Sequence, residues 1–182
     1  MYELPTSVAV SDVSYAIRSD YRAVLDICAA LSDPELDMRD KAAVALVIFY
    51  PDFDTMPPEH YEEALKQCFW FINGGSDETE KKAPKLVDWE QDFQYIIAPV
   101  NRVLGQEIRA IEYLHWWSFL SAYYEIGGNC VFAQIVQIRD KLARGKTLDK
   151  AEREWYRHNR NLVDFKQTYT ATEDELLKQW TK

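Results

Sequence analysis

The sequence contains few of the residues that build catalytic or metal sites. It holds three histidines and three cysteines in 182 residues, and no two of these six lie within five positions of each other. A dedicated zinc site usually begins with such a closely spaced pair, so we expect no metal site. His60, His115 and His158 fall on three separate predicted helices without a flanking signature. A nucleophile needs a base and an orienting group, so we expect no enzyme and no cofactor.

Long apolar runs are also missing. The longest, residues 42–50, is nine residues, whereas a membrane helix needs about 20. The first ten residues, MYELPTSVAV, have no basic region, so we expect no signal peptide and a cytoplasmic, non-secreted protein. Cys28, Cys68 and Cys130 each lie among apolar neighbours, which is typical of buried thiols in a reducing compartment.

Positive charge is scarce overall but concentrated in one segment. The net charge is −9, which disfavours nucleic-acid binding because phosphate backbones are repelled. Residues 139–166 nevertheless carry nine Lys or Arg against five Asp or Glu, whereas residues 1–138 carry ten against twenty-two. A basic segment on an acidic body could join copies head to tail or bind an acidic partner.

The hydrophobic pattern predicts a mainly α fold in one domain, residues 1–182. Hydrophobic residues make up 47% and aromatic residues 14% of the chain, as expected for a packed core. Alternating Val8, Val10, Val13, Tyr15 and Ile17 predict a β-hairpin over residues 4–17. Helical spacing predicts a bundle of about seven helices within residues 18–165, at 20–31 (N-capped by Ser19), 38–50, 57–73, 88–104, 107–125, 129–144 and 149–165. We expect residues 166–182 to be flexible or partly helical, with a short helix over 173–180.

One acidic stretch resembles the beginning of a calcium loop. Asp88, Glu90 and Asp92 have the right spacing, but Phe93 stands where that loop needs glycine, and Pro99 stands where it needs glutamate. A simpler interpretation is that Asp88 caps a helix and the other two acids interact favourably with its dipole. By the same dipole argument, Arg139, Lys141 and Arg144 fit the basic C-terminus of the 129–144 helix.

The 149–165 helix carries the candidate partner-binding residues. Arginines recur on it at spacings of four and three, beside aromatic residues and a histidine, and arginine with aromatics is typical of interface anchors. The candidates are Arg153, Trp155, Tyr156, Arg157, His158 and Arg160. The alternative is a solvated face with Trp155 buried in the core. Nucleic-acid stacking would use the same residue types, although the acidic body disfavours it.

Four blocks of sequence resemble a known phage protein family. They are LPTSVAV at 4–10, LVDWEQDFQYI at 86–96, YLHWWSFLSAYYEIG at 113–127, and FAQIVQIRDKLARGKTLDKAEREWYRHNRNLVD at 132–164. Their order and content resemble the family named for gene product fifteen, from the tail-module genes of long-tailed phages and prophages of Gram-positive bacteria. The double-Trp block and the IRDK…WYR block are the most specific parts.

The resemblance implies a role in tail assembly. Genes of the family typically lie between those of the major tail protein and the tape-measure protein, where tail assembly chaperones are encoded. A chaperone that binds the tape-measure protein, associates with its own copies in the host cytoplasm and leaves before the virion matures is therefore the leading hypothesis. A structural virion component, such as a tail-completion protein, is the first alternative, and a regulatory or nucleic-acid-binding protein is the second. The resemblance assigns no functional residue.

Overall fold

The computed structural model describes residues 3–76 and 83–166, which separate into two compact units. Within these ranges, unit 1 comprises residues 3–76 and 115–117, and unit 2 comprises residues 83–114 and 118–166. The expected mainly α fold with an N-terminal hairpin is confirmed. The expectation of a single domain stays a prediction. The short helix expected over 173–180 lies outside the described residues.

Unit 1 begins with the predicted hairpin. Strands β1 (Ser7–Val10) and β2 (Val13–Ala16) pair antiparallel, with Val10 opposite Val13. The two turn residues, Ser11 and Asp12, both have positive φ, at 48° and 65°, as a tight two-residue hairpin turn requires. No glycine occupies this turn. The Glu63 carboxylate supports it instead, accepting hydrogen bonds from the backbone N–H and hydroxyl of Ser11 at 3.0 and 2.8 Å.

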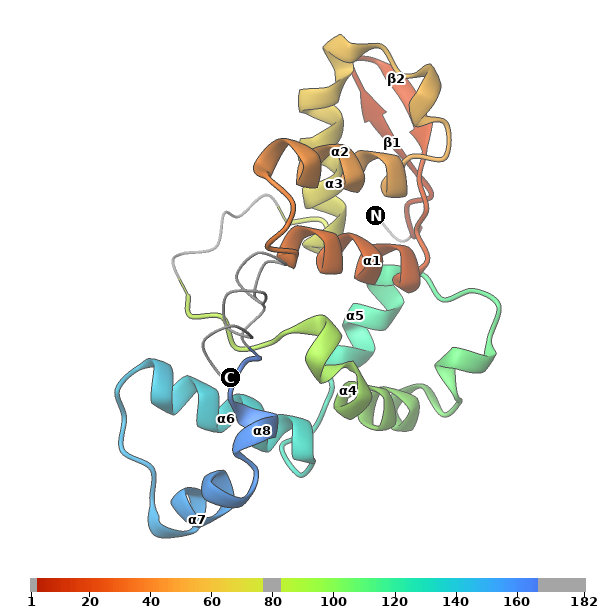
Figure 1. The fold of residues 1–182 in the computed structure, drawn as a ribbon. Helices are drawn as coiled ribbons and strands as arrows, with labels where there is room; N and C mark the ends of the chain where they lie inside the picture. The colour runs from red at the N-terminus through yellow and green to blue at the C-terminus, as the bar shows by residue number, and fades with distance from the viewer. Residues whose placement is uncertain (1–2, 77–82, 167–182) are drawn as a thin grey trace, which may run out of the picture. The chain divides into compact units, whose positions relative to one another are not determined.

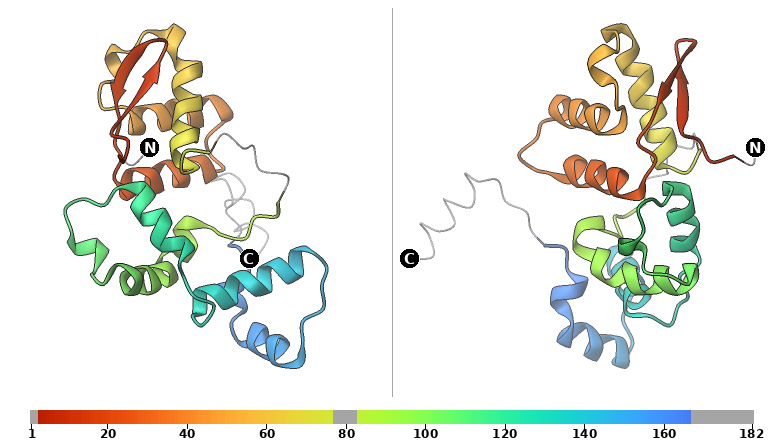
Figure 2. Two further views of the ribbon diagram at one scale, coloured as in Figure 1. Left: turned by 180° about the vertical axis from the view of Figure 1, so that it is seen from behind. Right: turned by 90° about the vertical axis from the view of Figure 1, so that its right-hand side faces the viewer.

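Three helices pack with the hairpin in unit 1. They are α1 (Tyr21–Ser32), α2 (Met38–Phe49) and α3 (Tyr61–Ile72), with the 3-10 turns η1 (Phe53–Thr55) and η2 (Pro58–His60) between α2 and α3. Strand β1 lies along α3, and α2 packs against both α1 and α3 (Figures 1 and 2). The N-cap of α1 is Asp20, whose carboxylate accepts from the Arg22 N–H. The prediction of Ser19 as this cap was wrong by one residue.

Residues 115–117 complete unit 1, although they lie far along the chain. Their backbone pairs with the start of α1: His115 forms a β-bridge with Asp20, and the Trp116 N–H donates to the Ser19 carbonyl at 2.8 Å. The helix expected over 107–125 is therefore wrong, because this pairing holds His115 in an extended conformation. The segment instead forms η3 (Ile108–Ala110) and a shorter α5 (Trp116–Tyr124).

The double tryptophan caps the end of α3. The last carbonyls of a helix have no partner within it, and here two indoles supply donors. Trp116 Nε1 donates to the Ile72 carbonyl at 2.8 Å, and Trp117 Nε1 donates to the Phe71 carbonyl at 2.9 Å. Gly75 follows with φ +87°, and a Cβ there would lie 3.0 Å from Cη2 of Trp117. The close approach of this ring accounts for the glycine.

Unit 2 contains α4 (Trp89–Leu104), η3, α5 from residue 118 onward, α6 (Val131–Ala143), α7 (Lys150–His158) and α8 (Arg160–Val163). Asp88 caps α4 by accepting from the Gln91 N–H, and Gly105 ends it with φ 69°, both as predicted. The N-cap of α6 is Cys130, which lies one residue after Asn129, the first residue of the helix predicted over 129–144. The single helix expected over 149–165 is also wrong, because Asn159 leaves helical geometry and separates α7 from α8.

Candidate functional site

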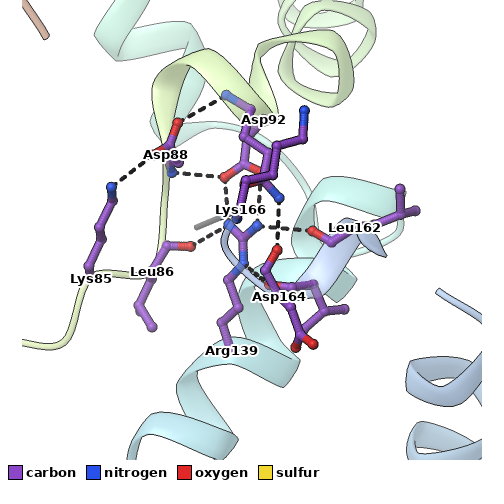
Figure 3. A network of polar contacts seen from close by, with 10 residues as sticks. Lys85, Leu86, Asp88, Asp92, Arg139, Leu162, Asp164 and Lys166 are labelled. Carbon is purple, nitrogen blue, oxygen red and sulfur yellow. Dashed lines mark hydrogen bonds and ion pairs between the residues drawn. The ribbon is translucent and has the colours of Figure 1, made fainter. Parts of the chain in front are cut away.

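A buried arginine organises the polar interior of unit 2. Arg139 on α6 is 4% exposed, and each of its five guanidinium N–H groups has an acceptor, as Figure 3 shows. Two donate to the Asp92 carboxylate of α4, at 2.5 and 3.0 Å. The other three donate to backbone carbonyls of Leu86, Leu162 and Val163 at 3.0, 2.9 and 2.6 Å. The guanidinium therefore has no N–H group left for a ligand.

Arg139 and Asp92 correct two sequence interpretations. Asp92 was interpreted only as a first-turn acid that interacts with the helix dipole, and in the structure it is fully buried and also accepts the Asp88 N–H at 2.9 Å. Arg139 was interpreted only as part of the basic C-terminus of its helix, and in the structure its side chain lies inside unit 2. The available signal was its position four residues after Ile135, which places it on the inward face of α6. Nothing in the sequence paired it with a carboxylate 47 positions away.

The buried pair joins the segment after α7 to α4. Gln91 of α4 donates to the Asp164 carbonyl and accepts from the Lys166 N–H, each at 3.0 Å. The Phe165 ring lies against the Arg139 guanidinium, 4.1 Å from ring centroid to Cζ. Unpaired buried polar atoms are costly, and among the described residues every buried side-chain nitrogen and oxygen has a partner. This network therefore holds the 162–166 segment in place, and with it α8 and the end of α7.

The start of α7 is fixed by a capping box. The Asp149 carboxylate accepts the Glu152 N–H at 2.9 Å, and the Glu152 carboxylate accepts the Asp149 N–H at 2.9 Å. Lys141 on α6 donates to the same glutamate at 2.5 Å. The hydrogen bond from Lys141 is the main reason that the pKa of Glu152 is lowered. Both ends of α7 are thus attached to neighbouring elements of unit 2.

Two of the six candidate residues lie on the inner side of α7. Trp155 and Tyr156 pack against a small core of Ile138, Leu148 and Val163. The Tyr156 hydroxyl donates to the Asp164 carboxylate at 2.7 Å, and this bond raises the pKa of the tyrosine. The alternative interpretation of Trp155 as a core residue therefore describes its position.

Arg153 and Arg157 lie on the outer side of α7, together with Lys150. Spacings of three and four place these three on one helix face, and all are exposed. Lys146, in the turn before α7, is also exposed. None of the four forms an ion pair with another residue in the described part of the chain. We call Lys146, Lys150, Arg153 and Arg157 the α7 cationic face.

The remaining candidates, His158 and Arg160, lie apart from that face. His158 Nδ1 is 2.8 Å from the Glu154 carbonyl, one turn earlier in the same helix. Arg160 belongs to α8 and donates to Asp164 at 2.8 Å, which raises the pKa of the arginine. The structure therefore brings Arg153 and Arg157 together and separates them from the aromatic candidates and from Arg160.

The three histidines have distinct hydrogen-bond partners. His60 Nδ1 is 2.8 Å from the Tyr15 hydroxyl. His115 Nε2 is 2.9 Å from the Pro5 carbonyl, while its Nδ1 accepts the Trp117 N–H. Within residues 3–76 and 83–166, no three His, Cys, Asp or Glu side chains are placed to hold a metal ion. Over the same ranges, no helix combines the length and apolar character that crossing a membrane requires.

Comparison with known proteins identifies one family. The family described as Bacteriophage Gp15 protein matches residues 1–165. That range covers unit 2 up to Phe165 and every candidate residue on α7 and α8. No curated protein and no solved structure matches the chain. Because the match spans most of the 182 residues, the chain belongs to the bacteriophage Gp15 protein family.

Proposed function

We propose that this chain is a phage tail assembly chaperone, which acts in the host cytoplasm by binding the tape-measure protein, further copies of itself, or both. Membership of the Gp15 family supports a phage assembly or structural protein. The resemblance described above adds the position of such genes beside the tape-measure gene. We also propose that the protein works by binding and not by catalysis, since the three histidines are separately engaged.

The observation that carries a binding role is the arrangement of α7. Its inner side is fixed by Trp155 and Tyr156, and its ends by the capping box and the Arg139 network. Its outer side presents the α7 cationic face without ion-pair partners among the described residues. A rigid helix that presents exposed arginines needs little further ordering on binding, which favours recognition of an acidic surface.

Co-expression tests the chaperone role. The tape-measure protein encoded in the same phage genome should move from the insoluble to the soluble fraction when this chain is present. It should also co-purify with the chain. Arg153→Glu with Arg157→Glu, on the α7 cationic face, should lose this effect, and the matched control, Arg39→Glu with Arg102→Glu at exposed arginines elsewhere, should keep it.

Analysis of finished particles separates the leading proposal from the first alternative. Mass spectrometry of purified virions should find this chain absent or far below the copy number of the tail proteins. A fixed stoichiometric amount in every particle would instead identify a structural tail component. A tape-measure protein that stays insoluble in the presence of the folded chain would contradict the chaperone role.

A further inference from the structure

The two units differ in charge balance. Residues 3–76, which make up most of described unit 1, carry thirteen Asp or Glu against five Lys or Arg. Residues 139–166 of unit 2 carry nine Lys or Arg against five Asp or Glu. Surfaces of opposite charge attract each other over distances of about 10 Å at ordinary ionic strength. These two parts of the chain therefore carry net charges of opposite sign.

Six exposed carboxylates gather where α3 begins. Three contacts bring their segments together: Ser11 bonds to Glu63, Tyr15 lies 2.8 Å from His60, and the rings of Phe53 and Tyr61 are 5.0 Å apart between centroids. The turn of the hairpin accordingly lies at the same end of α3 as its first residue (Figure 1). The exposed acids at this end are Asp12, Asp52, Asp54, Glu59, Glu62 and Glu63, and we call them the acidic end of unit 1.

Little positive charge offsets this surface locally. No Lys or Arg occurs between residues 50 and 65. Lys66 pairs with Glu62 at 2.6 Å. Asp52, Asp54 and Glu59 form no ion pair with any residue that the structure describes. The acidic end of unit 1 and the α7 cationic face are thus both exposed. Glu154, four residues after Lys150 and three before Arg157, lies on the same side of α7, and the face keeps a net positive charge.

We infer that the α7 cationic face of one copy binds the acidic end of unit 1 of a second copy. A second copy of this chain carries an acidic surface, the acidic end of unit 1, that is complementary in charge to the α7 cationic face. This inference rests on the proposed function only in taking α7 as the interaction surface, and it requires no tape-measure protein. Each copy carries both surfaces, so two copies can make the contact twice in a closed two-fold dimer, or successive copies can make it once each in a longer assembly.

Sedimentation of the purified full chain at increasing concentration tests the inference. The average mass should rise with concentration at low salt. The association constant should fall at least roughly tenfold between about 0.1 M and about 1 M NaCl, over which the Debye length shrinks from about 10 Å to about 3 Å. A chain that is monomeric at every concentration in low salt would overturn the inference, even if it solubilised the tape-measure protein.

Two charge-reversed variants then locate the contact. One carries Arg153→Glu with Arg157→Glu, and the other carries Asp54→Lys with Glu59→Lys. Each alone should stay monomeric, because each lacks one of the two surfaces. An equimolar mixture should associate, because the intact acidic end of the first variant meets the intact α7 cationic face of the second. The two reversed surfaces are also opposite in charge, so they should add to this association. A contact that used the same surface on both copies would instead let the variant that retains that surface associate on its own.

Matched controls exclude a general effect of net charge. Arg39→Glu with Arg102→Glu repeats the first change at exposed arginines elsewhere, and Asp26→Lys with Glu125→Lys repeats the second. Both controls should associate like the unmodified chain. Arg157→Gln alone should weaken association by a smaller factor than the double reversal. Association that survives both charge reversals, or a mixture that stays monomeric, would overturn the inference. A monomeric chain that binds polyglutamate or DNA through α7 would also overturn it.

Discussion

Arg139 and Asp92 form a bidentate ion pair inside unit 2, with guanidinium nitrogens 2.5 and 3.0 Å from the two carboxylate oxygens. Both side chains are almost completely buried. Two charges removed from water remain stable only when each is paired and fully hydrogen-bonded. Here three backbone carbonyls accept the remaining N–H groups of Arg139, and Asp92 accepts a further hydrogen bond from the Asp88 N–H. The stability of unit 2 should therefore be sensitive to either partner.

Removing one charge of this pair should destabilise the protein strongly. Arg139→Met or Asp92→Leu leaves the other charge buried and unpaired, which should lower the free energy of unfolding by about 3–5 kcal/mol. The double variant should be more stable than the sum of the single effects predicts. Arg144→Met, which breaks the exposed pair with Asp140, is the control and should cost at most about 1 kcal/mol. Urea unfolding followed by circular dichroism measures all four, and equal effects of Arg139→Met and Arg144→Met would contradict the prediction.

Replacing the capping indoles should weaken the end of α3. Trp116→Phe or Trp117→Phe keeps an aromatic ring but removes the N–H that binds the Ile72 or Phe71 carbonyl. Losing the Trp116 donor should cost about 1–3 kcal/mol. Losing the Trp117 donor should cost less, because the Phe71 carbonyl still accepts the Gly74 N–H at 3.1 Å. Trp70→Phe is the matched control, since Trp70 lies in the same aromatic cluster and its indole donates to no described group. Thermal unfolding compares the three, and a control as unstable as Trp117→Phe would show that ring size, not the hydrogen bond, matters.

The three cysteines should differ in reactivity. Burial raises the pKa of Cys28 to about 11, and burial together with the nearby Cys28 raises the pKa of Cys68 to about 12. Since the thiolate is the reactive form, neither should react quickly at pH 8 in the folded protein. Cys130, in the turn before α6, should give the one fast phase with an aromatic disulfide reagent, and all three should react after unfolding.

Cys130→Ser should abolish the fast phase and leave the slow ones unchanged. Cys68→Ser is the matched control, because it should leave the fast phase at full amplitude. A fast phase that persists in Cys130→Ser would mean that Cys28 or Cys68 is accessible without unfolding.

The charged carboxylate of Glu107 should stabilise the folded protein at neutral pH and lose this contribution at strongly acidic pH. Hydrogen bonds from the Arg109 side chain and backbone, with a further one from Asn101, hold its pKa at about 2 against an ordinary value of 4.5. A carboxylate whose pKa is lower in the folded state stabilises fully above its unfolded pKa, and this contribution is lost as the pH falls from 4.5 to about 2.

Glu107→Gln should therefore flatten the pH dependence of the unfolding midpoint in that window and lower the midpoint at pH 7. Glu125→Gln, at an exposed acid outside the Arg109 network, should retain the full slope. An unchanged slope in Glu107→Gln would contradict the role of this network.

The helix ends were predictable where a local rule decides them. Asp88 and Gly105 bound α4 as expected, because an N-capping carboxylate and a left-handed glycine act through their immediate neighbours. The 107–125 helix was predicted wrongly because its apolar pattern suits a helix, while long-range pairing of His115 with Asp20 prevents one. The sequence does not reveal such pairing, because it depends on residues 95 positions apart.

The candidate site was predictable in part for the same reason. Periodicity placed Arg153 and Arg157 on one helix face, since spacing along α7 is a local property. Periodicity could not predict that Trp155 and Tyr156 face inward, because their orientation depends on where Ile138 and Val163 lie in the fold. The acidic end of unit 1 was not predicted, since only the contacts at Glu63, His60 and Tyr61 bring its segments together.

The place of His115–Trp117 in unit 1 has a consequence for synthesis on the ribosome. The first 76 residues emerge early, but α3 lacks its two indole donors, and the Pro5 carbonyl before β1 lacks the His115 imidazole, until residue 117 has been added. The N-terminal unit is therefore less stable before that point than after it. A nascent chain arrested before His115 should be digested by proteases within α3, and one arrested well beyond Trp117 should resist.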